Sequence, residues 1–291
     1  MQAIKETIQK AMGTKLIWAS STCDLHFPKY DYSKFTEQEM EDIRRKYSVQ
    51  KMIVDGVEKC PSCERERLTS LLEEEAKKDA YEILNRGKYN TLAQKSILQD
   101  EEITEARFDN YRTENEPEAF HNLNLMEQHA QDILTGQAFN ILLYGTPGVG
   151  KSHLSYSLLH HVNELSDFTR SCLFIDLDEM LRKIRDSFNN PNSPYTEMYF
   201  TKLLSEVDLL VLDDLGAETG NEHTEKKASD FTGRILRAVA NSRQKKVTIV
   251  TTNLSGTQLN KMYDGKTLSR LSKNRKVVMF KETVDKRPLG Y

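Results

Sequence analysis

Short, nearly continuous apolar runs alternate with helical patterns along the C-terminal part of the chain. Runs without polar alternation are typical of strands that are covered on both faces. Between them, apolar residues recur at helical spacing, as with Leu154, Leu158 and Val162. The alternation predicts an α/β fold with a parallel sheet. The five predicted strands are residues 141–144, 173–176, 209–212, 247–251 and 276–280.

The distribution of residue types divides the chain into three stretches. Residues 1–67 contain three of the four cysteines and the single tryptophan. Residues 68–117 are highly charged, with apolar residues at helical spacing in their first part, and predict a helical connector followed by a looser linker. Residues 118–291 hold all five predicted strands and form the predicted α/β domain.

Composition excludes several classes of protein. A chain of 291 residues with 38% hydrophobic residues can build a core, and none of its apolar runs approaches the ~18 residues of a membrane helix. The N-terminus lacks the apolar stretch of a secretory signal, and four cysteines do not make a disulfide scaffold. We therefore expect a cytoplasmic protein without a membrane partner.

Charge is distributed unevenly along the chain. Residues 243–291 carry 12 Lys/Arg and 3 Asp/Glu, a charge of +9, so the other 242 residues carry 29 minus 41, or -12. A basic end on an acidic body suggests a local anionic partner. A solvated basic face is the other interpretation, and charge alone does not decide between them.

The segment from Gly145 to Ser152 matches the phosphate-binding pattern G-x-x-x-x-G-K-[ST] without a gap. A predicted strand precedes it and a helical pattern follows it, as this loop requires. Its backbone N–H groups can surround phosphate oxygens, and the N-terminus of the helix attracts the same anion. Lys151 suits the β- and γ-phosphates, and the Ser152 hydroxyl suits Mg²⁺. The predicted ATP-binding residues are Gly145, Thr146, Pro147, Gly148, Val149, Gly150, Lys151 and Ser152.

Two further predicted strands end in polar residues that suit hydrolysis. The third strand runs into Asp213 and Asp214. In a P-loop ATPase the first carboxylate holds Mg²⁺ and the next residue can orient the attacking water. Asp213 fits the first role and Asp214 the second, with Glu218 as the alternative for the second. Asn253 follows the fourth strand. Taken alone, it is better explained as a turn-initiating asparagine, but the two earlier motifs favour a position between γ-phosphate and water.

These motifs together resemble the AAA+ ATPases, and more narrowly the bacterial and phage helicase loaders of the DnaC/DnaI type. The residues that carry the resemblance are the P-loop, the Asp-Asp-Leu-Gly-Ala-Glu run at 213–218, and Thr251-Thr252-Asn253. The resemblance covers roughly residues 105–291 and includes the aromatic segment Phe108-Asp109-Asn110-Tyr111. It implies a parallel five-stranded sheet in the order 5-1-4-3-2. Only 38 residues follow Asn253, which agrees with little or no C-terminal lid.

Further roles follow from the resemblance alone. Arg270 occupies the place of the arginine finger, which reaches the ATP of a neighbouring subunit and implies self-association through the ATP site. Arg287 occupies the place of the second sensor, which contacts the γ-phosphate within its own subunit. The implied catalytic set is Lys151, Asp213, Asp214, Glu218, Asn253, Arg270 and Arg287.

The same resemblance implies a helical insertion that contacts DNA after the second strand. Residues 178–199 correspond to it and combine cations with aromatic rings, as a groove for single strands does. The candidate DNA contacts are Arg182, Lys183 and Arg185. An amphipathic helix with its charges in water is the alternative, because Leu181 and Ile184 could pack inward.

The N-terminal stretch contains two pairs of potential metal ligands. Cys23 and His26 form C-x₂-H, and Cys60 and Cys63 form C-x₂-C. Two such pairs suit a tetrahedral Zn²⁺ site. A redox pair at Cys60 and Cys63 is the first alternative, but no βαβ pattern surrounds it. Cys172 lies in a predicted strand and is expected to be a core thiol.

The resemblance implies an ATP-dependent loader of a replicative hexameric helicase, acting on single-stranded DNA with ATP, Mg²⁺ and Zn²⁺. The N-terminal zinc domain would bind the helicase. Two alternatives remain open from the sequence. One is a transposition helper ATPase of the IstB type, whose ATPase core is similar, and the other is a zinc-dependent adaptor in which nucleotide only switches conformation.

Overall fold

The computed structural model describes residues 17–26, 35–217 and 229–287. The chain divides into two compact units after Tyr81, and each unit is described by itself. Glu218, one of the expected catalytic residues, lies outside the described residues. Within the described ranges, no helix has both the length and the apolar content that crossing a bilayer requires.

The first unit contains a small antiparallel sheet with the strand order β1-β2-β3. Its elements are β1 (Ile17–Thr22), α2 (Glu37–Tyr47), β2 (Gln50–Val54), β3 (Val57–Lys59) and the start of α3 (Pro61–Tyr89). Asp55 and Gly56 have φ angles of 51° and 76°, and Val54 pairs with Val57. Positive φ at both central residues is the geometry of the tight hairpin turn that Asp-Gly favours. The hairpin therefore leads the chain directly from β3 into Cys60 and α3.

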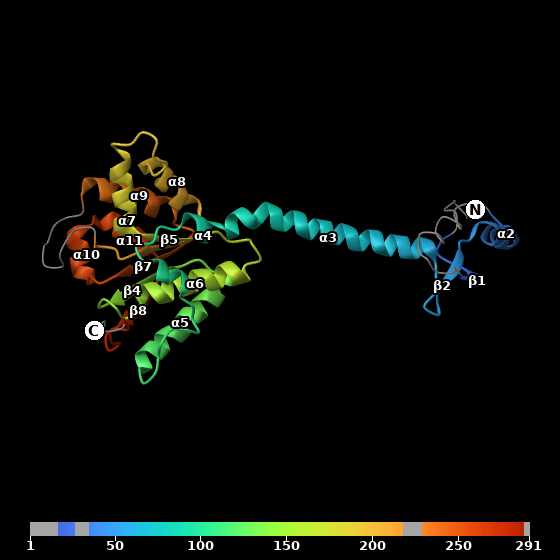
Figure 1. Ribbon diagram of the computed structural model, residues 1–291, viewed down its shortest axis with the longest axis horizontal. Coiled ribbons are helices and arrows are strands. Elements are labelled where there is room, and N and C mark those ends of the chain that lie inside the picture. Colours follow the sequence, from blue (N-terminus) through green and yellow to red (C-terminus); the bar gives the residue numbers. More distant parts are fainter. Residues whose placement is uncertain (1–16, 27–34, 218–228, 288–291) are drawn as a thin grey trace. The chain divides into compact units, whose positions relative to one another are not determined.

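The second unit is built on a parallel sheet with the order β5-β6-β7-β4-β8 (Figure 1). Numbered within this sheet, the order is 2-3-4-1-5, which confirms the expected arrangement and all five predicted strands. The strands are β4 (Asn140–Gly145), β5 (Cys172–Asp176), β6 (Leu209–Asp213), β7 (Val247–Thr252) and β8 (Arg275–Phe280). The helices of this unit are α4 (Thr91–Lys95), a 3-10 helix (Glu101–Glu105), α5 (Pro117–Leu134), α6 (Lys151–Leu165), α7 (Leu177–Ser187), α8 (Glu197–Glu206), α9 (Asp230–Ser242), α10 (Gly256–Met262) and α11 (Gly265–Leu271).

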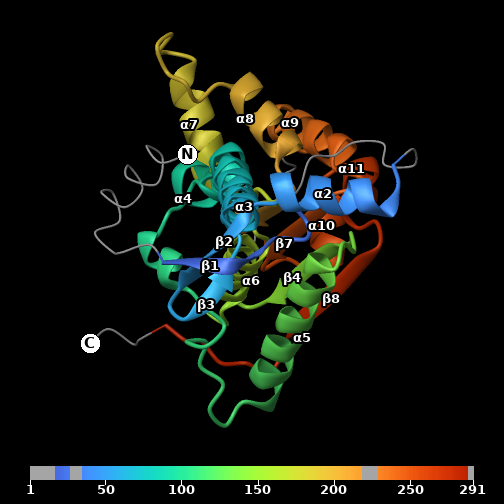
Figure 2. The same cartoon turned by 90° about the vertical axis from the view of Figure 1, so that its right-hand side faces the viewer.

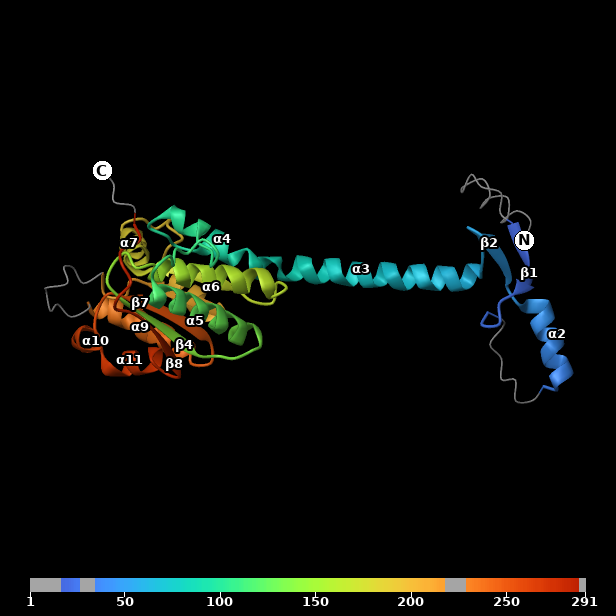
Figure 3. The same ribbon diagram turned by 90° about the horizontal axis from the view of Figure 1, so that it is seen from below.

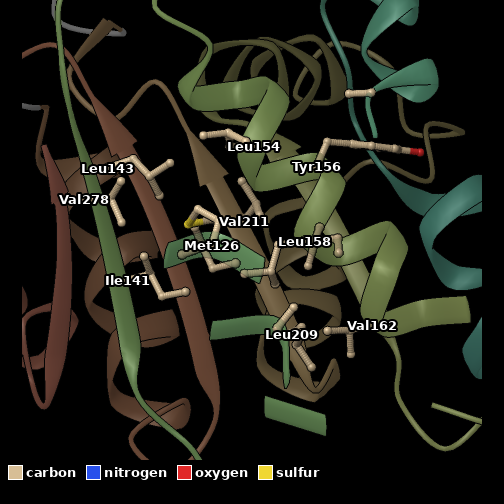
Figure 4. Close-up of a cluster of buried hydrophobic side chains, with 14 of the residues drawn as sticks. Met126, Ile141, Leu143, Leu154, Tyr156, Leu158, Val162, Leu209, Val211 and Val278 are labelled. Carbon is tan, nitrogen blue, oxygen red and sulfur yellow. The ribbon is translucent and has the colours of Figure 1, made fainter. Parts of the chain in front are cut away.

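Two hydrophobic cores cover the two faces of this sheet. Alternate strand residues point to opposite faces, so Leu209 and Val211 of β6 join one core and Leu210 and Leu212 join the other. The first core also receives α5 and α6, including Met126 and Leu158 (Figure 4). The second is covered by α7 to α11, and Figure 3 shows α9 to α11 on the side of the sheet away from α5 and α6. Burial on both faces explains why the strands lack polar alternation.

The segment 68–117, expected to be a helical connector followed by a looser linker, is helical in its first part, but its second part packs on the first core. Helix α3 begins before it, at Pro61, and after α3 the chain packs on the second unit. The Ile97 N–H donates to the Phe174 carbonyl at 2.9 Å, and the Ile97 carbonyl accepts from the Asp176 N–H at 2.8 Å. Phe108 and Tyr111 are buried in the first core. These apolar residues are irregularly spaced among charges, so periodicity does not reveal them.

Arg243 is a buried cation that joins the end of α8 to the starts of β6 and β7 through hydrogen bonds to their backbone carbonyls. Its guanidinium Nη1 donates to the carbonyls of Leu204 and Val207 at 2.7 Å each, and Nη2 donates to those of Asp208 and Val247 at 3.1 and 2.6 Å. Burial lowers the pKa of this guanidinium to about 9. The five N–H donors of arginine suit a site that presents backbone carbonyls from several elements.

We expect Arg243→Met to lower the free energy of unfolding by about 3 kcal/mol, because it leaves several buried carbonyls without a donor. Chemical denaturation of the full chain measures this loss. Arg237→Met is the matched control, since its pair with Asp264 at 3.3 Å is exposed and should contribute less than about 1 kcal/mol. Equal losses in the two variants would contradict a special role for Arg243.

Candidate nucleotide site and metal centre

The carboxyl ends of three neighbouring strands, β4, β7 and β6, form the wall of a cavity of about 390 Å³. Ligand sites in open α/β sheets lie at this edge because loops from adjacent strands meet there. The P-loop follows β4, Asn253 follows β7, and Asp213 ends β6. Strand register therefore assembles groups that are up to 108 residues apart in the sequence, from Gly145 to Asn253.

Lys151 begins α6 and is buried. Its ammonium donates to the carbonyls of Gly145 and Thr146 at 2.9 and 2.8 Å, and to the side-chain oxygen of Asn253 at 2.7 Å. The charge is thus held inside the cavity by neutral acceptors. A phosphate can compete for this ammonium, because a charged acceptor forms stronger hydrogen bonds than a carbonyl does.

Ser152 and Asp213 are the pair that suits a magnesium ion. The Ser152 hydroxyl donates to both Asp213 carboxylate oxygens at 2.9 and 2.8 Å, and the Thr251 hydroxyl donates to one of them at 2.6 Å. Hydroxyl and carboxylate oxygens are the ligands that Mg²⁺ prefers, so the donor set fits. Burial raises the pKa of Asp213 to about 6, and a divalent cation would favour its ionised form.

Asp214 lies next to the cavity in an unusual backbone conformation. Its φ angle is 56°, in the left-handed region, which costs free energy for a residue other than glycine. The Thr251 hydroxyl accepts from the Asp214 N–H at 2.8 Å, and the Asn253 amide donates to the Asp214 carboxylate at 3.0 Å. These bonds hold the carboxylate at the cavity wall, where it can accept a proton from a water molecule.

Tyr111 supports the P-loop from outside the cavity. Its hydroxyl donates to the Val149 carbonyl at 2.8 Å. Gly150 has a φ angle of 90°, and a Cβ there would lie 2.4 Å from the Tyr111 ring. The loop therefore needs glycine at 150 for its conformation and for the close approach of this ring. The aromatic segment at 108–111 was singled out in the sequence, but its contact with the P-loop was not foreseen.

Asp176 is a second group at this edge that sequence analysis missed. It ends β5, pairs in register with Asp213, and lines the cavity together with Leu98 and Gln99. Its carboxylate accepts from the Glu179 N–H at 2.8 Å, which caps α7. An apolar strand followed by an acidic residue is the same signal that identified Asp213, so the pattern was present in the sequence.

The two arginines expected to contact nucleotide, Arg270 and Arg287, differ in their position relative to the cavity. Arg287 lines the cavity, and its guanidinium Nε donates to Asp285 at 3.0 Å. Arg270 lies in the last turn of α11, is absent from the residues that line the cavity, and donates to the Lys266 carbonyl at 3.4 Å. Of these two arginines, only Arg287 therefore lines this cavity.

The candidate DNA contacts lie on α7. Leu181 and Ile184 are buried, as the amphipathic interpretation expects. Arg182 and Lys183 both pair with Glu179, the latter at 3.3 Å, and the Lys183 ammonium lies 5.2 Å from the centre of the Tyr195 ring. Arg185 is exposed. The helix thus presents cations beside an aromatic ring while its apolar face packs on the sheet.

The four metal-ligand candidates of the first unit converge. Their ligand atoms all lie within 4.8 Å of one another. His26 Nδ1 is 3.5, 3.6 and 3.2 Å from the sulfurs of Cys23, Cys60 and Cys63, and the Cys23 and Cys63 sulfurs are 3.7 Å apart. A tetrahedral Zn²⁺, with bonds of about 2.3 Å to sulfur and about 2.0 Å to nitrogen, separates its ligands by roughly 3.5–3.8 Å. The donor set and its spacing therefore fit zinc.

Glu66, on the second turn of α3, orients the histidine of this cluster. His26 Nε2 lies 3.0 Å from the Glu66 carboxylate. A proton on Nε2 leaves Nδ1, which faces the three sulfurs, as the metal-binding nitrogen. Sequence analysis missed this residue because it lies outside the two chelating pairs. Cys172 is fully buried in β5, as expected for a core thiol.

Comparison with known protein families gives a match to the model for IstB-like ATP binding proteins over residues 63–277. This match spans most of the chain, including every described residue of the nucleotide cavity except those after 277. The chain belongs to this family.

Relatives of this IstB-like protein include the replicative helicase loader DnaC of Escherichia coli strain K12. The two are 27% identical over 164 residues, which cover 56% of this chain and 62% of DnaC. The chain thus matches less than two thirds of the length of that relative. The uncharacterized protein YdaV of the same strain is 31% identical over 117 residues, or 40% of this chain and 44% of YdaV.

Comparison with solved structures finds proteins of similar fold. The crystal structure of the DnaC helicase loader is 20% identical, with a TM-score of 0.50, and the match covers 62% of this chain and all of that chain (100%). A putative primosome component from Streptococcus pyogenes serotype M3 is 16% identical, also with a TM-score of 0.50, covering 66% of this chain and 93% of that one. At these identities the likeness concerns the fold.

We expect the IstB-like chain to bind one Zn²⁺ and Cys63→Ser to lose it, whereas the buried Cys172→Ala should keep it. Metal analysis of the purified protein measures the content. Glu66→Gln should retain zinc with about 10–100-fold weaker affinity in a chelator competition, because the His26 ring loses its orientation. Zinc affinity equal to that of the unaltered chain in Glu66→Gln would show that Glu66 does not act on the site.

Proposed function

We propose that this protein is an ATPase that loads a replicative ring helicase onto single-stranded DNA. The observation that carries the proposal is the convergence of Lys151, Ser152, Asp213 and Asn253 on one cavity, in a chain similar to DnaC. The AAA+ fold is shared by proteins with other clients, so the client is inferred from the helicase loader relative. The setting is the cytoplasm, where replication takes place in bacteria.

In the ATP site, each side chain has a role that follows from its position. The P-loop N–H groups and Lys151 bind the phosphates, and Ser152 with Asp213 would hold Mg²⁺. Magnesium, when bound, neutralises charge on the phosphates. Asp214 accepts a proton from the attacking water. Asn253 is hydrogen-bonded to both Lys151 and Asp214, and so holds the ammonium and the carboxylate in fixed positions relative to each other. Glu218 is the alternative residue for orienting the attacking water.

Assembly would complete the site. Arg270 lies away from its own cavity, so we infer that it serves the cavity of a neighbouring subunit. A cation supplied by a neighbour stabilises the transition-state charge and makes hydrolysis depend on assembly. Self-association through the ATP site would therefore make binding of the helicase depend on which nucleotide is bound.

Two other surfaces would engage the partners. Arg182, Lys183 and Arg185 on α7 would contact the phosphates of single-stranded DNA, and the Tyr195 ring could stack on a base. The zinc-binding first unit would bind the helicase. We expect this binding to be largely independent of sequence, because cations and an aromatic ring address phosphates and base faces rather than base edges.

A transposition helper of the IstB type is the second candidate, and the family match itself favours it. Its client would be a transposase on duplex DNA. The two candidates share the ATP site and differ in the partner, so binding to the partner separates them.

The decisive experiment mixes the full chain with a ring helicase, ATP and Mg²⁺ and measures the mass of the complex by chromatography with light scattering. We expect a stable complex, and we expect Cys60→Ser/Cys63→Ser to lose it while retaining ATP. No complex with any nucleotide, together with binding to a transposase, would place the protein with the IstB helpers. If the variant that lacks the Cys60 and Cys63 thiols still forms the complex, the first unit is not part of the interface with the helicase.

We expect Arg270→Ala to lower the ATP hydrolysis rate at least about 100-fold while leaving the dissociation constant for ATP within about twofold, because the missing cation acts only in the transition state. Steady-state hydrolysis and equilibrium nucleotide binding measure the two quantities. Lys266→Ala, one turn earlier on α11, is the control. Hydrolysis by Arg270→Ala at the unaltered rate would place the finger elsewhere.

A further inference from the structure

In the residues that the structure describes, β8 is followed by an extended segment. Residues 281–287, here called the strap, follow Phe280 without regular secondary structure. They pass the residues that lead into α5 (Figure 2). A backbone hydrogen bond from Lys286 to Gly148 then joins them to the P-loop. The single apolar residue of the strap, Val284, is exposed, so polar contacts define the path of the strap.

Glu118, in the first turn of α5, holds the start of the strap. Its carboxylate accepts from the N–H groups of Lys281 at 2.6 Å, Glu282 at 2.5 Å and Thr283 at 2.9 Å, and from the Thr283 hydroxyl at 3.3 Å. Partial burial tends to raise the pKa of this carboxyl, but the backbone donors outweigh it and lower the pKa. Three consecutive N–H groups on one carboxylate fix the backbone direction of the strap.

Glu116 holds the middle of the strap. Its carboxylate accepts from the Val284 N–H at 3.1 Å and pairs with the Lys286 ammonium at 2.8 Å. The Lys286 N–H in turn donates to the carbonyl of Gly148 in the P-loop at 2.8 Å. Because Arg112 donates to the Lys286 carbonyl, this residue is bonded on both sides of its backbone. The two glutamates thus connect α5 to the phosphate-binding loop.

The end of the strap carries Arg287 to the nucleotide cavity. The Asp285 carboxylate lies against Gly148, where a Cβ would come within 2.0 Å of Asp285 Oδ1. Arg287 pairs with this carboxylate and lines the cavity with Lys151 and Asn253. The guanidinium is exposed, so its place depends on the strap rather than on packing.

We propose that Glu118 is a positioning residue for nucleotide recognition: it fixes the strap on the P-loop and so holds Arg287 where the guanidinium distinguishes a nucleoside triphosphate from a diphosphate. The inference rests on the ATP site of the proposed function and deepens it. Two carboxylates thus hold the seven residues of the strap, and its last residue lines the nucleotide cavity. A merely structural Glu118 would instead affect all nucleotides equally.

The test compares the dissociation constants of full-length variants for ATP and ADP, both with Mg²⁺. Glu118→Gln keeps the shape of the side chain but replaces one acceptor oxygen with an NH₂ group that faces backbone donors. We expect its ATP affinity to fall about tenfold and its ADP affinity to stay within about twofold, the scale of one charge-assisted contact. Glu127→Gln, on the exposed side of α5, is the matched control and should change neither.

Glu116→Gln provides a second route to the same loss. This variant weakens the contact of the strap at Lys286 and leaves the hydrogen bonds of Glu118 in place. Its nucleotide affinities test the proposal if Glu118→Gln fails to fold. It should also lower ATP affinity more than ADP affinity.

A double variant shows whether Glu118 acts through Arg287. If it does, Glu118→Gln/Arg287→Ala will have the same ratio of ATP to ADP affinity as Arg287→Ala alone. Equal losses for ATP and ADP, unchanged affinity for both, or fully additive effects in the double variant would overturn the proposal. Lys151→Ala should lose both nucleotides in the same assay. If Lys151→Ala still binds both nucleotides, the assignment of the ATP site is wrong. The binding test for Glu118 does not depend on ATP hydrolysis or on a helicase complex, so it can be interpreted even if both are absent.

Discussion

The hydrogen bond of 2.7 Å between the Lys151 ammonium and the Asn253 side-chain oxygen connects the groups on which the nucleotide site depends. It exists because β4 and β7 are adjacent parallel strands in register, with Tyr144 opposite Thr252. The next strand, β6, brings Asp213 and Asp214 to the same edge. A change in strand order would separate these groups, so the sheet topology is a condition for the chemistry.

The sequence predicted this part of the molecule well because its signals are local. The P-loop is a contiguous run of eight residues, and Asp213 and Asn253 each follow a buried strand directly. The boundaries of the five strands differ from the predicted ones by one residue at most. Their order came from the resemblance, since apolar runs carry no information about which strands are neighbours.

Contacts between distant segments were beyond the sequence. Glu118 and Thr283 are 165 residues apart, and neither stands out by type or spacing. The same is true of Tyr111 against Gly150 and of Glu66 beside His26. The expectation of a looser linker in the second part of 68–117 was wrong for a related reason. A segment rich in charges resembles a solvated connector, although a few of its apolar residues are buried in the core. In physical terms, periodicity reports one face of a regular element, whereas these segments are irregular.

The position of Ile97 beside β5 also bears on how copies of this protein can meet. A bare edge strand offers unpaired N–H and C=O groups to any other strand, which promotes sheet extension from molecule to molecule. Ile97 occupies that edge at β5. At the opposite end, β8 begins with the exposed cations Arg275 and Lys276, and Asn122 donates to its Met279 carbonyl at 2.9 Å. Both edges thus disfavour the addition of a further strand to this sheet.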